Sequence, residues 1–331
     1  MVWYYKKQET YRKRGNMKLK KIGLNNITVF VKFELELSDG INIIIGENGS
    51  GKTIFLKSIY DTCHNKQWDM LDEKYVRKYA DNIGYQPATY IEYITDDGKE
   101  ETCWLVKDGQ APCVKGNSDI LYIPVMEMLS HSKGLISLYE KYDLSFENVQ
   151  IDIIQNAQLP ETRKPADFER KLLDIIGNVI GGEVIYEKEK FFVEKKDGIK
   201  VDFEMEAEGF RKFALLWKLI RNGLLHPGSI LLWDEPETNI NPELLPTLAD
   251  ILLEMQRNDI QIILATHSYN LAKYFELKKN VNDKILFHSF RRTENMIHAV
   301  SDKIFGKITN NKLIEADERL LDLAYAKGMA D

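Results

Sequence analysis

No apolar run in the sequence approaches the roughly 18–20 residues that a bilayer-spanning helix needs. Its N-terminus is too polar for a secretory signal, since no apolar core follows the first basic residues. Cysteine is scarce, with Cys63, Cys103 and Cys113 in 331 residues and no CxxC pair. These absences argue against a membrane protein and a disulfide-stapled secreted domain. They predict a cytoplasmic chain with free thiols and no membrane partner.

Length and composition fit one large globular domain that carries an insertion. A hydrophobic content of 44% over 331 residues is typical of a folded core, and no internal repeat or low-complexity tract interrupts it. The organisation that we expect is a basic leader arm over 1–16, the N-terminal part of an α/β domain over 17–125, a helical lobe over 126–182 and the C-terminal part over 183–331.

The charge is uneven along the chain. Residues 1–21 hold eight Lys or Arg residues and one acid, Glu9, whereas the whole chain carries a net charge of −6. A basic arm on an acidic body can contact nucleic acid or an acidic partner. It can also be a solvated leader upstream of a second start at Met17, and the sequence leaves both interpretations open.

Strand patterns dominate the first third of the chain. The strands that we expect are 18–22, 29–37, 41–45, 89–94, 102–106 and 120–124. The last three alternate with Asp-Gly and Gly-Asn turns, which predicts antiparallel hairpins. A helix is predicted over 53–62, and a charged, helix-like stretch follows over 65–83.

Helical periodicity marks the middle of the chain, and strands and helices alternate after it. The runs 135–139 and 168–176 predict helices of a lobe that ends at Gly181-Gly182. The later elements that we expect are a hairpin over 184–204, helices at 210–224, 268–275 and 311–327, a helix opened by Asn241-Pro242, and strands at 229–233, 261–265 and 284–290. Buried strands that alternate with helices imply a mostly parallel sheet flanked by helices.

A phosphate-binding loop follows the strand 41–45. The segment matches GxxxxGK[ST] and opens a helix, which is the setting that the pattern requires. Its glycines let successive backbone N–H groups point at phosphate oxygens, and the helix N-terminus adds positive potential. We expect Lys52 to bind the β- and γ-phosphates of ATP, and Thr53 to ligate Mg²⁺. The predicted nucleotide-binding residues are Gly46, Glu47, Asn48, Gly49, Ser50, Gly51, Lys52 and Thr53.

Two acids at the end of the apolar strand 229–233 form the second motif. Since parallel strands share one carboxyl edge, Asp234 and Glu235 should lie beside the phosphate loop. We expect Asp234 to hold Mg²⁺ together with Thr53, and Glu235 to orient or deprotonate the attacking water. Two acids alone can simply mark a loop, but beside Lys52 they predict a site for ATP hydrolysis.

A histidine follows the next buried strand. His267 lies just past the strand 261–265, so it should reach the same edge of the sheet. There it could donate a hydrogen bond to the γ-phosphate and sense the loss of that group. A histidine at a strand end is often only a loop residue, but its position relative to the other two motifs favours a catalytic role.

These three motifs, in this order, resemble those of the ABC-type P-loop ATPases. That group includes transporter engines, chromosome-maintenance and recombination-repair ATPases, and the OLD-type phage-defence ATPases. Asn48 and the run Asp234-Glu235-Pro236 strengthen the likeness. The resemblance implies an ABC-type fold with an antiparallel N-terminal β region and a helical insertion lobe. It also implies a head-to-tail dimer, in which each ATP lies between one phosphate loop and a signature segment of the other subunit.

The signature expected from this resemblance has the form Leu-Ser-x-Gly-x at the start of a helix. Gly209 matches, but Ala207 replaces the serine and has no hydroxyl to donate to a γ-phosphate, which argues against a transporter engine. Arg211 and Lys212 could supply charge instead, or could lie on a solvated helix face. The signature residues predicted to act in trans are Ala207, Glu208, Gly209, Arg211 and Lys212.

A narrower resemblance covers most of residues 17–331. The stretches 123–131, 207–209 and 234–242 are similar to those of single-domain ATPases that include the ATPase of PARIS-type anti-phage systems. In that group the ATPase often acts as the sensor or keeper of a separate effector, commonly a nuclease. No second catalytic centre follows His267, so we expect no toprim or HNH nuclease within this chain.

Three functions follow from these patterns. The first is an ATPase that hydrolyses ATP at a dimer interface and switches a partner effector in phage defence or genome maintenance. The second is an ATP-held oligomeric scaffold with little turnover, for which Ala207 is the best support. The third, a transporter subunit, is disfavoured by the signature. Gln86 and Glu127 are the candidates for the Mg²⁺-contacting position that the superfamily fills with glutamine.

Overall fold

The computed structural model describes residues 17–64, 87–95, 97–106, 119–142, 144–162, 164–293, 296–309 and 311–328. The basic leader 1–16, the helix-like stretch 65–83, Gln86 and Cys113 lie outside these ranges. Cys63 and Cys103 are both buried. Within the described ranges, no helix combines the length and the apolar character that crossing a bilayer requires.

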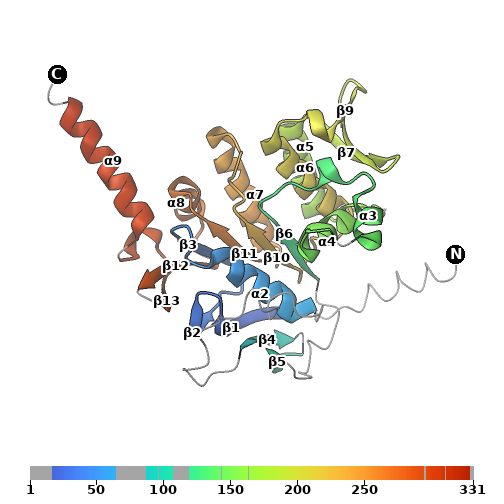
Figure 1. Cartoon of the computed structure of the whole chain (residues 1–331). Coiled ribbons are helices and arrows are strands. Elements are labelled where there is room, and N and C mark those ends of the chain that lie inside the picture. The colour runs from blue at the N-terminus through green and yellow to red at the C-terminus, as the bar shows by residue number, and fades with distance from the viewer. Residues whose placement is uncertain are drawn as a thin grey trace.

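The central sheet has six strands and is mostly parallel (Figure 1). Its strands, in spatial order, are β13 (Met296–Asp302), β12 (Ile285–Thr293), β3 (Ile41–Gly46), β11 (Gln261–Thr266), β10 (Ile230–Asp234) and β6 (Ile120–Ile123). β3 is parallel to both β11 and β12, and only β13 runs antiparallel to its neighbour. Every residue of β3, β10 and β11 is buried, because both faces of the sheet are covered.

Alternate residues of the central strands enter two different cores. Ile43 and Ile45 of β3 pack with the helices that follow the later strands, whereas Ile44 packs with the helix after the phosphate loop and with the N-terminal sheet. The helices around the sheet are α2 (Lys52–His64), α6 (Glu208–Arg221), α7 (Leu245–Arg257) and α8 (Tyr269–Lys278). This two-sided burial confirms the predicted α/β class.

The N-terminal sheet is antiparallel, with the order β2-β1-β4-β5. Its strands are β1 (Met17–Ile27), β2 (Phe30–Glu36), β4 (Ala88–Thr95) and β5 (Glu100–Val106). The hairpin interpretation is confirmed for β4 and β5. It is wrong for 120–124, because β6 joins the central sheet in parallel with β10, with Ile120 opposite Ile230. All four residues of β6 are buried, which is typical of a strand covered on both faces.

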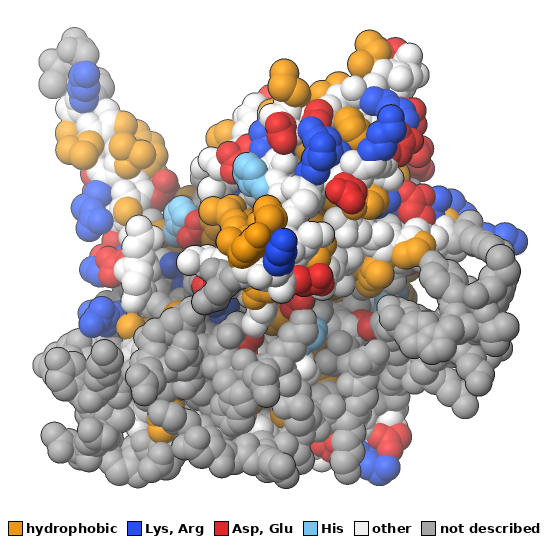
Figure 2. Space-filling view, turned by 45° about the vertical axis from the view of Figure 1, so that its right-hand side comes forward, with side chains coloured by type: hydrophobic (Ala, Val, Ile, Leu, Met, Phe, Trp, Pro, Cys, Tyr) orange, Lys and Arg blue, Asp and Glu red, His pale blue; other side chains and the backbone are white. Residues whose placement is uncertain are grey.

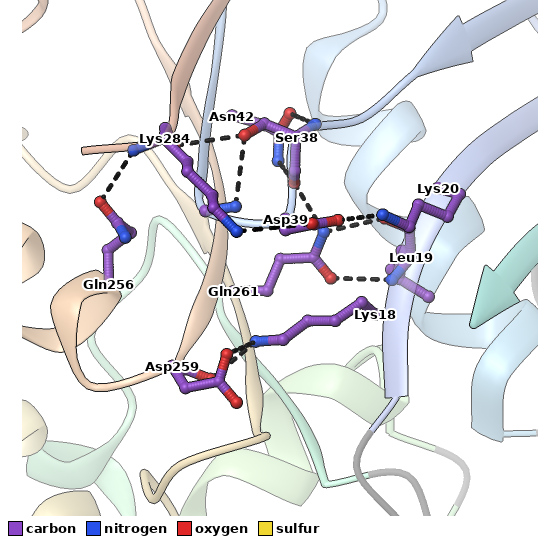
Figure 3. A network of polar contacts seen from close by, with 11 residues as sticks. Lys18, Leu19, Lys20, Ser38, Asp39, Asn42, Gln256, Asp259, Gln261 and Lys284 are labelled. Atoms are coloured by element: carbon purple, nitrogen blue, oxygen red, sulfur yellow. Dashed lines mark hydrogen bonds and ion pairs between the residues drawn. The ribbon is translucent and has the colours of Figure 1, made fainter. Parts of the chain in front are cut away.

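A polar network joins the two sheets (Figure 3). The Gln261 side-chain amide accepts from the backbone N–H of Leu19 at 2.8 Å and donates to the carbonyl oxygens of Leu19 at 2.9 Å and of Ser38 at 2.8 Å. In the same region, Lys18 of β1 forms an ion pair of 2.9 Å with Asp259. This part of the basic segment therefore belongs to the fold.

The segment between β6 and α6, which contains the predicted helical lobe 126–182, combines helices with a small sheet. Its elements are α3 (Leu135–Lys141), α4 (Asn148–Ala157), α5 (Asp167–Ile180), β7 (Gly182–Glu187), β8 (Lys190–Lys195) and β9 (Lys200–Asp202). Short 3₁₀ turns are η3 (Leu129–His131), η4 (Phe203–Met205), η5 (Pro242–Leu244) and η6 (Phe305–Lys307). β7, β8 and β9 form an antiparallel sheet, as the hairpin pattern predicts.

The last helix, α9 (Lys312–Gly328), stands apart from the body (Figures 1 and 2). Leu313 and Ile314 in its first turn pack against the larger core. Farther along, Leu320 and Leu323 are 65% and 70% exposed. Tertiary contacts therefore support only the beginning of this helix.

His288 is a fully buried base at the junction of β3, β12 and β13. Its Nδ1 lies 2.7 Å from the Ser301 hydroxyl, and its Nε2 lies 3.1 Å from Asn42 Oδ1. Asn42 Oδ1 is an acceptor, because it also receives the N–H of Ser38, and so a neutral ring that donates from Nε2 satisfies both contacts. Burial lowers the pKa of His288 to about 3.

This buried histidine should make stability fall as the pH drops. Between about pH 6.5 and about pH 3 the unfolded chain binds a proton at His288 that the folded chain does not. Folding should therefore lose about 2 kcal/mol from this group between about pH 7 and about pH 5. Chemical denaturation at both pH values should show a smaller difference for His288→Gln than for the native chain. Exposed His298 gives the control, His298→Gln, which should keep the native difference; equal behaviour of the two variants would contradict the prediction.

Candidate functional site

Three neighbouring parallel strands bring the predicted motifs together. The phosphate loop follows β3, His267 follows β11, and Asp234 with Glu235 ends β10. Asp234 is in register with Ala265 of β11, which is itself in register with Ile44 of β3. Segments more than two hundred residues apart therefore share one edge of the sheet.

The phosphate loop has the conformation that its glycines permit. Gly49 and Gly51 have φ angles of +76° and +89°, which favour glycine. A Cβ on Gly51 would also lie 2.7 Å from the Phe30 ring. Lys52 begins α2, and its Nζ donates to the carbonyl oxygens of Gly46 at 2.8 Å and Glu47 at 3.0 Å. Its ammonium is thus held over the loop where phosphates would bind.

Asp234 and Thr53 fit a Mg²⁺ site. Asp234 is 1% exposed, and its Oδ1 accepts no hydrogen bond from the described residues. Burial raises the pKa of Asp234, whereas the neighbouring Thr53 and Tyr122 hydroxyls act in the opposite direction. A cation would stabilise this buried carboxylate. In the described part of the chain, no group of three or more His, Cys, Asp or Glu side chains is arranged so that it could hold a metal ion by itself. One carboxylate and one hydroxyl match the sparse protein ligation of Mg²⁺ with substrate phosphates.

Glu235 is held in an unusual backbone conformation. Its φ angle is +46°, in the left-handed region that costs a non-glycine residue roughly 1–2 kcal/mol. Its N–H donates to the Ala265 carbonyl at 2.9 Å, and its carbonyl accepts from Lys212 Nζ at 2.9 Å. Its carboxylate accepts from the Thr238 hydroxyl at 3.1 Å and lies 3.2 Å from His267 Nδ1. Strain that is held in place in this way is typical of functional sites.

Glu237 is a site residue that the motifs do not indicate. Its Oε1 accepts from the Thr266 hydroxyl at 2.6 Å and from the His267 N–H at 3.1 Å. Its Oε2 is buried and has no hydrogen-bond partner among the described residues. Glu237 therefore holds the turn that carries His267, and a third acid faces the site. The run Asp-Glu-Pro-Glu contains this residue, but its direction depends on the path of the loop after Pro236.

The start of α6 lies where a signature helix is expected. Ala207 is its N-cap and makes no side-chain capping bond. Gly209 packs so closely against the loop after Glu235 that a Cβ would lie 2.7 Å from the Asn239 carbonyl oxygen. Lys212 is 2% exposed, and so the solvated-face interpretation is wrong for this residue. Its ammonium points into its own subunit, toward Glu235.

Arg211 and Glu127 also contact each other within the chain. Arg211 donates to the carbonyl oxygens of Glu206 at 2.9 Å and Glu204 at 3.2 Å, and its guanidinium lies 3.7 Å from the Glu127 carboxylate. Glu127 accepts from the N–H of Leu129 at 2.5 Å. The Glu127 carboxylate thus contacts η3 and the signature segment, and its predicted contact with Mg²⁺ stays a prediction.

Two family models match this chain. Residues 126–273 match the model described as "AAA domain, putative AbiEii toxin, Type IV TA system", and residues 21–104 match one described as "AAA domain". The second match contains the phosphate loop, and the first contains the two acids and His267. Site, fold and matches point to one class: the chain has the fold of the ABC-like P-loop ATPases, and the site residues lie in segments that are similar to AAA domains.

Within that class the chain is similar to curated DNA-repair proteins. It is 31% identical over 127 residues to the DNA replication and repair protein RecF of Cytophaga hutchinsonii, covering 36% of this chain and 33% of that protein. It is 22% identical over 232 residues to RecF of Clostridioides difficile, covering 61% and 60%. A stretch of 42 residues is 48% identical to the DNA double-strand break repair Rad50 ATPase of Nanoarchaeum equitans, covering 13% and 5%. The chain thus spans a third to three fifths of these RecF proteins.

Solved structures of SMC heads share the fold. A SmcHead bound to the C-winged helix domain of ScpA superposes with a TM-score of 0.55 at 13% identity, covering 87% of this chain and 98% of that one. The Smc head of Pyrococcus furiosus, bound to the C-terminal domain of ScpA, gives 0.52 at 13% identity, covering 93% and 100%. These matches confirm the predicted ABC-like P-loop fold.

Proposed function

We propose that this chain hydrolyses ATP with Mg²⁺ at a site completed by a second copy, and that hydrolysis controls a separate effector protein. The observation that carries the proposal is the contact of 3.2 Å between His267 Nδ1 and the Glu235 carboxylate, next to Lys52 on the adjoining strand end. A half-exposed histidine fixed beside a strained carboxylate suits the orientation of water more than it suits a purely structural turn.

Each site residue would have a separate role in phosphoryl transfer. Mg²⁺, when bound, would supply positive charge that offsets the negative charge of the phosphates. Thr53 and Asp234 would hold that ion, and Lys52 would exchange its loop carbonyls for phosphate oxygens. Glu235 would orient and deprotonate the attacking water, while Glu237 keeps His267 in position. These groups come from one subunit, and the second copy would complete the site with its signature segment 207–209.

The setting that we propose is phage defence or genome maintenance. The description of the larger family match names a toxin of a toxin–antitoxin system, and the RecF and Rad50 relatives act in DNA repair. The SMC heads of similar fold are seen bound to a second protein, ScpA. These likenesses support a regulator that acts on a partner, and we propose a nuclease as that effector. We also propose that the basic segment 1–16 contacts nucleic acid, because of its charge.

A scaffold held together by ATP is the second candidate. Ala207 favours it, because a signature without a hydroxyl gives a weaker contact to a γ-phosphate bound by the other subunit. In that case ATP would bind and subunits would associate, but phosphate would be released slowly. Multiple-turnover phosphate release, measured beside association, separates the two candidates.

Association should depend on the nucleotide. A site that needs residues from two subunits binds Mg²⁺-ATP best in the dimer, and so ATP should shift the monomer–dimer equilibrium by mass action while ADP should not. Analytical ultracentrifugation with no nucleotide, with ADP and with ATP measures this shift. Lys52→Ala is the control that should stay monomeric in all three conditions. One mass in every condition for the native chain would indicate a constitutive oligomer and contradict ATP-gated dimerisation.

A further inference from the structure

The second turn of α6 is bonded through Lys212 to the backbone of Glu235. Lys212 Nζ donates to the Glu235 carbonyl oxygen at 2.9 Å, from a side chain that is 2% exposed. We propose that Lys212 is a positioning residue: it holds Glu235 in its strained conformation, so that the placement of α6 decides whether Glu235 can act. This inference rests on the proposed function, in which Glu235 handles the attacking water.

A buried ammonium at this place requires an explanation. Burial lowers the pKa of Lys212, while Glu237, Glu208 and Glu235 act in the opposite direction. Despite these acids, Lys212 forms no ion pair within 4.0 Å among the described residues. An apolar side chain would fill the same volume without the cost of removing a charge from water. What the ammonium adds is its hydrogen bond to the Glu235 carbonyl.

The Glu235 carbonyl accepts from the backbone N–H of Thr238 at 3.2 Å as well as from Lys212, and the bond from Lys212 is the shorter of the two. Glu235 has a φ angle of +46°, and the chirality of an L-residue disfavours this conformation. Pro236 follows directly, and a proline favours an extended conformation at the residue before it. Two local preferences therefore oppose the observed backbone. Without the bond to Lys212, we expect Glu235 to relax and its carboxylate to leave Thr238 and His267.

A second contact joins α6 to the same loop. A Cβ on Gly209 would lie 2.7 Å from the Asn239 carbonyl oxygen and 3.1 Å from Ile240 Cα. The start of the helix thus contacts both ends of the segment 235–240, so that a displacement of α6 would also displace this segment. In the proposed dimer, residues 207–209 face the nucleotide of the other subunit. Binding there would shift α6 and, through Lys212, would change Glu235 in the subunit that owns the helix.

The test compares two buried lysines of one helix. Lys212→Met should lower kcat for ATP roughly ten- to hundredfold, the cost of misplacing a reacting group by about 1 Å. The Kd of a non-hydrolysable ATP analogue should stay within about threefold of the native value, because Glu235 acts on water in the transition state. Lys218→Met is the control: Lys218 is 3% exposed, but its partner is Glu161 at 2.7 Å, away from the site. Its kcat should not change, and Lys212→Arg should recover part of the loss.

The crystal structure of Lys212→Met gives a readout that does not depend on activity. We expect Glu235 to adopt a negative φ angle; a retained positive φ, or an unchanged kcat in an active native background, overturns the inference. A weaker Kd with unchanged kcat would make Lys212 a phosphate ligand and also overturns it. Equal rates for the native chain and Glu235→Gln would instead refute the proposed function. If Lys212→Met does not fold, Lys212→Gln, which keeps a shorter donor, takes its place with the same expectations.

Discussion

Glu235→Gln should reduce ATP turnover by roughly 10²–10⁴-fold, the usual contribution of a positioned acid–base group. The substitution keeps the shape of the side chain and leaves Asp234 and Thr53 to hold Mg²⁺. Nucleotide binding should survive, since the lost function belongs to the transition state. Removing a negative charge that faces the γ-phosphate should also populate the ATP-bound dimer more. Phosphate release and sedimentation together measure this pair of opposite effects.

Two other outcomes would lead to different conclusions. Equal rates of ATP turnover for the native chain and the variant would favour the ATP-held scaffold. Ala207 would then belong to a site that binds ATP without hydrolysing it. Loss of both binding and turnover would mean that Glu235 ligates the metal and that the roles of Asp234 and Glu235 are exchanged. The exposed Glu243, a few residues along the same loop, provides the matched control, because Glu243→Gln should behave as the native chain does.

Lys52→Ala should abolish ATP binding at the concentrations where the native chain is saturated. Lys52 is the only basic residue of the described loop 46–53, and its ammonium lies 2.8 Å from the carbonyl oxygen of Gly46 and 3.0 Å from that of Glu47. Its removal takes away a point charge on the β- and γ-phosphates together with the two bonds that organise the loop. Equilibrium binding of a fluorescent ATP analogue measures the loss.

The control for this prediction is Lys278→Ala on α8. Lys278 pairs with Asp250 at 2.7 Å on the surface, so its loss should leave the affinity for nucleotide unchanged. Native affinity in Lys52→Ala would show that the loop is not the phosphate site. The whole assignment of Asp234, Glu235 and His267 would then fail with it.

Local patterns were sufficient to predict the main parts of the site. The glycine spacing, the apolar strand and the helix start lie within about fifteen consecutive residues around Lys52. The phosphate loop can therefore be predicted from local sequence alone. The two acids and His267 each follow an apolar run, and the parallel-sheet rule then brings them to one edge. Their arrangement around β3 follows from these few facts.

Features that depend on distant partners could not be predicted in this way. β6 has the composition of a hairpin strand, but its partner β10 begins more than a hundred residues later. Whether Lys212 faces solvent, another subunit or Glu235 depends on how α6 packs against the loop 235–240. The role of Glu237 similarly requires the turn at Pro236 to be known. The positive φ angle of Glu235 could not be predicted, because glutamate is not a residue type that favours the left-handed conformation.

The position of β3 also affects how the protein is made on the ribosome. β3 comprises residues 41–46, yet its two neighbours in the sheet are β11 at 261–266 and β12 at 285–293. A nascent chain must therefore carry an apolar strand with both edges unpaired until nearly all of the domain has been translated. Such a segment, Ile41-Asn42-Ile43-Ile44-Ile45, is prone to pair with other chains. Synthesis of this protein should accordingly depend on chaperones that shield early segments, and truncation before β12 should yield aggregates rather than a partly folded domain.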